Sequence, residues 1–269
     1  MAAGTITREL WKRYTAIQFR IQNEAANLMK DYISRNGFTD REAAIAYAFG
    51  LATKYGEAAA AAACEMYDLS AQIAGVAVPA AEPAETATLK ETADFLQKAS
   101  EQSVQNVSAA VGNLAKRAGA DTTLKNAARD GAEAAWVPVG DTCAFCIMLA
   151  SNGWQHQSKK AAAQHAKHIH NNCDCQYAVR FNGQGGPAGY DETKYQQMYE
   201  NAPLDHWNTP DGKPPPGHED AEKPTWQNRV KALRRAAYTE NSEKINAAAR
   251  SNYAKRKERE SSKAEEIDV

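Results

Sequence analysis

The chain has 269 residues and a formal net charge of −1 at pH 7, so its bulk charge indicates no particular partner. Its longest run of small apolar residues, at 58–63, is far shorter than the roughly 20 residues that cross a bilayer. The opening sequence MAAGTITRELWKRYT also lacks the apolar core of a signal peptide. We therefore expect no membrane span, no secretion by that route, and cysteines that stay reduced.

Composition favours a mainly α-helical fold. Hydrophobic residues make up 43% of the chain, but many are alanine, and the mean hydropathy of −0.63 is low. Residues 5–36 have the spacing of a long amphipathic helix that begins at a Thr5 cap and ends at the RNG sequence of 35–37. The expected buried face consists of Leu10, Tyr14, Ile17 and Ile21.

A second helix is expected to start at the capping box TDRE (39–42), with Thr39 as its cap, and to run toward Ala74. A Pro/Ala linker follows near 74–85. Residues 86–118 form a third helical block, which RAGAD at 117–121 should break, and a short helix is expected at 122–135.

The helical periodicity of the sequence ends after residue 135, and its composition changes. We expect a helical domain at 1–135, a small Cys/His-clamped α+β module at 136–181, an irregular Gly/Pro-rich linker at 182–228 and a basic helical tail at 229–269. Within the module, CQYAVRF is predicted to form a short strand.

The module holds four of the five cysteines of the chain, in the pattern C-x2-C-x23-H-x2-C-x-C. Zn²⁺ takes four tetrahedral ligands and binds thiolates and imidazoles well, so two ligand pairs from separate turns can close one site. The pattern predicts a structural zinc site with five candidates for four places. The candidate ligands are Cys143, Cys146, His170, Cys173 and Cys175.

Other interpretations of these residues stay open. Three alternatives to the zinc site fit the spacing less well: a redox pair, packing thiols without metal, and a catalytic thiol paired with a histidine. His165 and His168 are weaker ligand candidates, and Trp136 and Trp154 are expected to be packing residues. Asp141, Ser151 and His168 offer the residue types of a hydrolase triad, as almost any chain of this length does. No P-loop, GxGxxG or HExxH motif is present in the sequence.

The tail is strongly basic. Between Arg229 and Arg259 there are ten lysines and arginines against three glutamates. A basic helix of this kind can follow phosphates without sequence preference, and it can equally dock on an acidic protein or stay solvated.

The sequences VPVGDTCAFCIMLASNGW and HAKHIHNNCDCQ resemble the phage Mu F-like minor head proteins, the head-morphogenesis family of tailed phages. That family typically carries Cys-x-x-Cys followed by His-x-Asn-Cys-x-Cys. In this chain the second half of the signature contains His170, Cys173 and Cys175. Asn171 stands where proline is common, and Asp174 stands where arginine is common. The signature covers about forty residues, and the tail at 240–258 agrees with it in character.

The resemblance implies a non-enzymatic minor capsid protein that lies inside the phage head near the portal and assists capsid assembly and the packaging or ejection of DNA. It implies assembly in the host cytoplasm, with the portal protein, the major capsid or scaffold protein and packaged DNA as partners. Two alternatives remain: a capsid maturation protease, which some relatives are held to be, and a DNA-binding protein acting through the basic tail.

Overall fold

The computed structural model describes residues 4–100, 103–140, 142–157, 173, 175–204, 213–214, 216–217, 225–241 and 244. The chain divides into two compact units. The helical unit comprises Met1–Thr142 and Asn152–Thr193, and the second unit comprises Cys143–Ser151 and Lys194–Val269. The predicted fold class is confirmed: the protein is mainly α-helical with one small antiparallel sheet.

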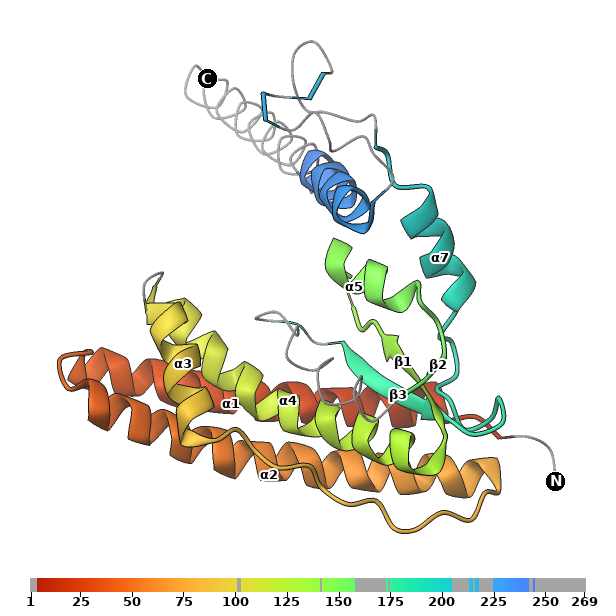
Figure 1. Ribbon diagram of the computed structural model, residues 1–269, viewed down its shortest axis with the longest axis horizontal. Coiled ribbons are helices and arrows are strands. Elements are labelled where there is room, and N and C mark those ends of the chain that lie inside the picture. Colours follow the sequence, from red (N-terminus) through yellow and green to blue (C-terminus); the bar gives the residue numbers. More distant parts are fainter. Residues whose placement is uncertain are drawn as a thin grey trace, which may run out of the picture. The chain divides into compact units, whose positions relative to one another are not determined.

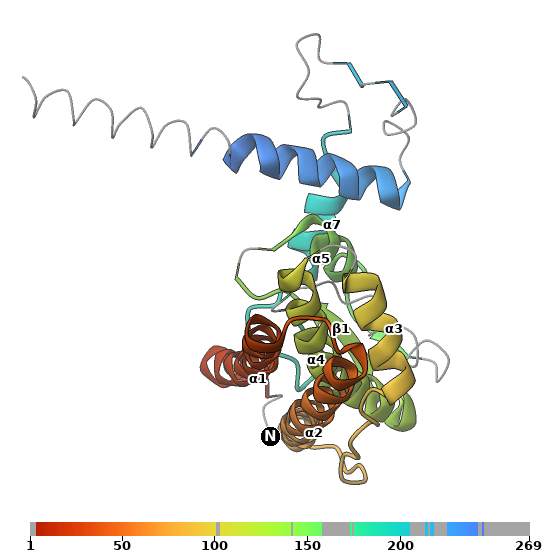
Figure 2. The ribbon, with the colours of Figure 1, turned by 90° about the vertical axis from the view of Figure 1, so that its left-hand side faces the viewer.

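Three long helices build the helical unit: α1 (Arg8–Asn36), α2 (Arg41–Ala74) and α4 (Val104–Asp130). They pack against one another along their lengths, and the shorter α3 (Leu89–Ser100) packs on α2 and α4 (Figures 1 and 2). Their shared core is rich in alanine. Among the described residues, no helix has both the length and the apolar character needed to cross a bilayer.

The first two helices begin one or two residues later than expected. The cap of α1 is Thr7 rather than Thr5, and that of α2 is Asp40 rather than Thr39. Each cap has extended backbone, and its side chain accepts a hydrogen bond from the amide three residues on, at 3.2 Å and 3.0 Å. Both sequences offer two capping residues, and the one next to the first helical residue takes the role.

The expected buried face of α1 is correct at Tyr14, which is buried, and at Leu10 and Ile21, which are partly buried against the core. It is wrong at Ile17, which is 44% exposed, and it omits two buried glutamines, Gln18 and Gln22. The amide of Gln18 donates to the carbonyl oxygen of Ala59 on α2 at 2.9 Å. A polar side chain is tolerated there because a hydrogen bond offsets its desolvation.

The expected break at 117–121 is wrong. The expected helix at 122–135 is correct over residues 122–130, which form the end of α4, and wrong at 133–135, which belong to a strand. Helix α4 begins after the Ser103 cap and runs unbroken to Asp130, and α3 is a separate element of the expected block. Gly119 lies where an added Cβ would come within 3.0 Å of the Ala59 carbonyl oxygen. This glycine therefore permits close helix packing, and an ion pair of 3.3 Å from Arg117 to Asp121 spans the expected break.

The predicted linker has no regular structure, but it is fastened to the bundle. We call residues 75–88 the strap. Asn126 of α4 accepts a hydrogen bond from the amide of Glu82 at 3.0 Å and donates to its carbonyl oxygen at 2.9 Å. Thr122 accepts from the amide of Ala84 at 2.9 Å. These bonds satisfy backbone groups that a sheet or helix would otherwise pair.

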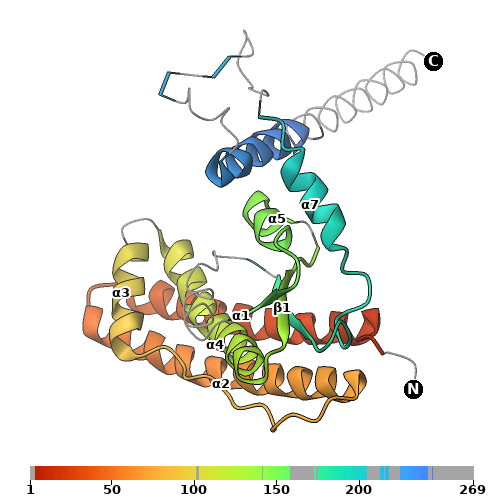
Figure 3. The same cartoon turned by 45° about the vertical axis from the view of Figure 1, so that its right-hand side comes forward.

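A three-stranded antiparallel sheet in the order β2-β1-β3 completes the helical unit (Figure 1), and its central strand β1 follows α4 in the chain (Figure 3). Its strands are β1 (Glu133–Val137), β2 (Gln155–His156) and β3 (Gln176–Arg180). The predicted strand in CQYAVRF is confirmed as β3, which contacts α2 and α4. Strand β1 replaces the end of the short helix that we expected, and Gly131, at φ 67°, ends α4 just before it.

The second unit contains α5 (Ala144–Ala150), most of α7 (Glu192–Glu200) and a helix over residues 226–241. Helix α7 lies in the segment that we expected to be irregular. The predicted helix of the basic tail is confirmed over its described residues. Arg229 donates to the carbonyl oxygens of Tyr199 and Glu200 at the end of α7, and Arg235 donates to that of Leu204.

Replacement of Gly112 by alanine should destabilise the helical unit. An added Cβ would lie 2.6 Å from the carbonyl oxygen of Gln22 on α1, so the two helix backbones must separate. We expect Gly112→Ala to lower the free energy of unfolding by about 1–3 kcal/mol. Gly50→Ala is the matched control: nothing lies within 4 Å of its added Cβ, and it should gain up to about 1 kcal/mol. Urea denaturation followed by circular dichroism measures both, and equal effects would contradict the packing argument.

Candidate metal centre

The first cysteine pair lies at the start of α5 in the second unit. Cys143 is the N-cap residue, with extended backbone, and its sulfur accepts a hydrogen bond from the amide of Cys146 at 3.4 Å. Cys143 is exposed, whereas Cys146 is 1% exposed. The C-x2-C spacing thus places both residues on one turn, as the sequence led us to expect.

The second pair lies in the helical unit, directly before β3. Cys173 and Cys175 are 3% and 2% exposed, and their sulfur atoms lie within 4.8 Å of each other. Two thiolates on one tetrahedral zinc are about 3.8 Å apart, given Zn–S bonds of about 2.3 Å. A small side-chain adjustment would therefore let this buried pair hold one ion. All five cysteines of the chain are free thiols.

Lys116 of α4 lies beside the second pair. This lysine is completely buried, and its ammonium group donates a hydrogen bond to the carbonyl oxygen of Cys173. The ammonium nitrogen also lies 5.6 Å from the ring centroid of Trp136 on β1. Trp136 stacks edge-on against Tyr177 of β3, with ring centroids 4.7 Å apart, and the expectation that it is a packing residue is confirmed.

Sequence reasoning missed Lys116. A lysine on a helix is ordinarily assigned to the solvent face. The available signal was its setting in NLAKRAGA, a run of small residues that suits a helix buried on most sides. Because α4 is buried around nearly its whole circumference, even a charged position on it becomes interior.

An ion pair holds the two strands that carry this site in register. Arg180 of β3 donates to both carboxylate oxygens of Glu133 on β1, at 2.7 Å and 3.0 Å. This hydrogen bonding lowers the pKa of Glu133 below its ordinary value of 4.5. Arg180 also lies 4.8 Å from the ring centroid of Trp154, which packs edge-on against Tyr190.

The remaining candidates are placed as follows. Four of them lie outside the described residues: His165, His168, His170 and Asp141. The predicted role of His170 as a metal ligand and the candidate catalytic triad therefore stay predictions. Ser151 is the C-cap residue of α5. Cys64, the fifth cysteine, is half-buried on α2 within the helical unit, and burial raises the pKa of its thiol.

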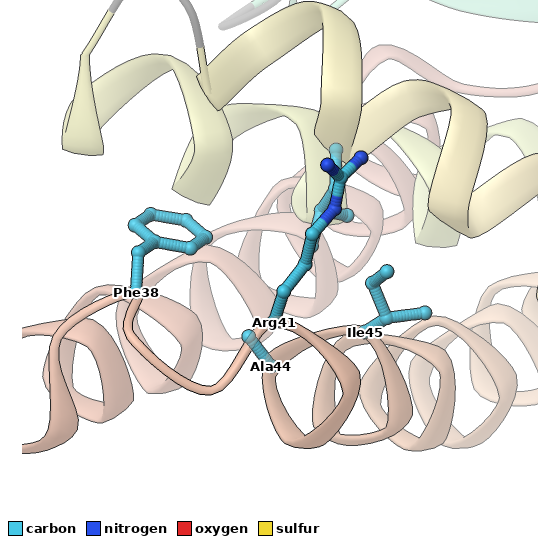
Figure 4. Close-up of a pocket in the computed structure, with 5 residues that line it drawn as sticks. Phe38, Arg41, Ala44 and Ile45 are labelled. Atoms are coloured by element: carbon cyan, nitrogen blue, oxygen red, sulfur yellow. The ribbon is translucent and has the colours of Figure 1, made fainter.

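A separate hollow offers no comparable chemistry. A cavity of about 190 Å³ lies where the α1–α2 turn meets α3, and Arg41 extends across it between Phe38 and Ile45 (Figure 4). Ala44 and Leu96 complete its lining. The lining has one charged group and no cysteine, histidine or carboxylate, so it supplies neither metal ligands nor an acid–base pair.

The family model described as VG15 protein matches residues 5–202, a span that includes both cysteine pairs and the whole three-helix bundle. The chain belongs to the VG15 protein family. It is therefore a phage protein. No curated protein and no solved structure matches the chain. The VG15 match ends two residues after α7, before the basic tail begins.

Removal of the Glu133 carboxylate should weaken the sheet in a pH-dependent manner. Because the pKa of Glu133 is lower in the folded chain, its stabilising effect is complete above pH 4.5 and is lost as the pH falls through the folded-state pKa. At pH 7 we expect Glu133→Gln to lose up to about 1 kcal/mol of unfolding free energy. The difference from the wild type should shrink by pH 3 in urea titrations, and a constant difference would contradict the ion-pair assignment.

Proposed function

We propose that this phage protein is a minor capsid component that lies inside the head near the portal and assists capsid assembly and the packaging or ejection of DNA. The observation that carries the proposal is the family membership over residues 5–202, since that span contains the CAFC and HNNCDC sequences that resemble the Mu F-like minor head proteins. The α1–α2 hairpin supports it: α2, with 34 residues, is about 50 Å long, which suits an extended protein contact.

We propose that the cysteine module binds one structural zinc ion. The spacing of the sequence assigns three ligands to the thiols of Cys146, Cys173 and Cys175, each of which is buried, and the fourth to Cys143 or His170. Thiolates of this number favour zinc over the hard cations. Four protein ligands leave no open coordination position, so the centre would stabilise the module rather than catalyse a reaction.

The proposed partners are the portal protein, the major capsid or scaffold protein, and packaged DNA. Contact with DNA would fall mainly to the basic residues beyond Arg235. Arg229 and Arg235 already donate to backbone carbonyl oxygens of the second unit, which makes them structural residues. The other basic residues up to Arg259 lie mostly outside the described part of the chain.

The virion role has a direct test. Purified phage particles, and tailless heads from the same infection, should contain this protein at a small fraction of the copy number of the major capsid protein, as measured by quantitative mass spectrometry. Loss of the gene should reduce the yield of filled heads, and a tail truncation after residue 241 should lower DNA content or infectivity while leaving the protein in the head. Absence from both particles, with the protein abundant in the lysate, would refute the structural role.

Zinc content tests the metal centre. Freshly reduced, full-length protein should contain about one zinc per chain, and Cys146→Ser and Cys173→Ser should each lose it, because a tetrahedral site tolerates the loss of a thiolate poorly. Cys64→Ser is the matched control and should keep its zinc, since Cys64 lies outside the two pairs. Elemental analysis after gel filtration measures the zinc content of the wild type and of the three variants. A metal-free wild type, or equal loss in the control, would remove the proposal.

A further inference from the structure

A charged residue outside the expected ligand set lies against the candidate metal centre. Lys116 has no exposed surface, and its ammonium group donates to the main-chain carbonyl of Cys173. The neighbouring surface is the aromatic face of Trp136, at 5.6 Å. All three residues belong to the helical unit, so this arrangement depends on that unit alone.

Burial of an ammonium group carries a large desolvation cost, which a nearby anion offsets best. A zinc ion with three or four cysteine ligands is such an anion. Three thiolates and a neutral histidine leave a net charge of −1 on the centre, and four thiolates leave −2. The cost of burying the lysine and the cost of burying the metal–thiolate centre therefore decrease together.

The hydrogen bond adds a second effect. The acceptor of the Lys116 bond is the peptide carbonyl of Cys173, and Cys175 follows two residues later, immediately before β3. A donor from α4 thus fixes the backbone that carries both thiols. Outer-sphere contacts of this kind orient metal ligands and tune their basicity.

We propose that Lys116 is the outer-sphere positioning residue of the metal centre: its charge offsets that of the zinc–thiolate group, and its hydrogen bond fixes the segment of Cys173 and Cys175. This rests on the proposed zinc site. It also explains why a helix of small residues carries a lysine on its buried side.

The experiment measures zinc affinity in the full-length protein by competition with a chromogenic chelator. Lys116→Met removes the charge and the donor, whereas Lys116→Gln removes the charge and keeps a donor. Both should weaken zinc binding by about 10–100-fold. The metal-free forms should be at least as resistant to urea as the wild type, because a buried charge has been removed. Lys125→Met, on an exposed position of the same helix, should bind zinc as the wild type does.

The outcomes separate the two proposals. If the wild type takes up neither zinc nor cobalt, the metal centre itself is refuted and Lys116 has no such role. If the wild type binds zinc and both Lys116 variants bind it equally well, only the role of Lys116 is refuted. A purely structural lysine would lower the stability of metal-free and loaded protein alike and leave affinity unchanged. The absorption spectrum of the cobalt-loaded protein gives a second readout, which should shift in both Lys116 variants and not in Lys125→Met.

Discussion

The close approach of α1, α2 and α4 is the constraint on which the rest of the helical unit depends. Gly112 lies against the carbonyl of Gln22, where an added Cβ would require the helices to shift, and Gly119 lies against that of Ala59, where an added Cβ would make a tight contact. Helix backbones this near to each other leave little room for branched side chains, so alanine fills the core. The interface gains specificity from its buried polar groups instead. Gln18 bonds to Ala59, and Tyr14, whose pKa burial raises to about 12, stays neutral beside it.

Close packing also determines where the cysteines lie. Because α4 is buried on nearly all sides, it can carry the sheet on one side and the strap on another. Gly131 ends the helix and sets the direction of β1, and β1 pairs with β3 through the register that Glu133 and Arg180 fix. Cys173 and Cys175 enter β3 at the end opposite to that ion pair. Their burial thus follows from the position of α4, and Lys116 reaches them because it projects from the same helix.

The sequence predicted the elements whose signals are local. The hairpin of two long helices follows from the RNG stop at 35–37, the capping residues at 39–42 and the Pro/Ala linker after Ala74, and β3 follows from the CQYAVRF sequence. The errors arose where tertiary packing overrides local preference. RAGAD has the composition of a break, but its glycine serves helix contact. Ile17 is apolar yet exposed, while Gln18 is polar and buried, since hydrophobicity does not reveal which face meets a neighbouring helix. For the candidate site, spacing alone identified the two cysteine pairs, but the buried lysine beside them depends on three-dimensional packing.

The family match covers the helical bundle and the cysteine pairs but not the basic tail. It also includes α7, and it stops before the ten basic residues between Arg229 and Arg259. Within the helical unit, the features inside the match are tied together physically, because the other long helices, the sheet and the strap all contact α4. In the proposed DNA contact, the basic residues beyond Arg235 carry no such constraint, because a helix that follows phosphates needs positive charge and solvation rather than a particular neighbour. The bundle with its sheet is therefore the part of the match whose residues constrain one another most strongly.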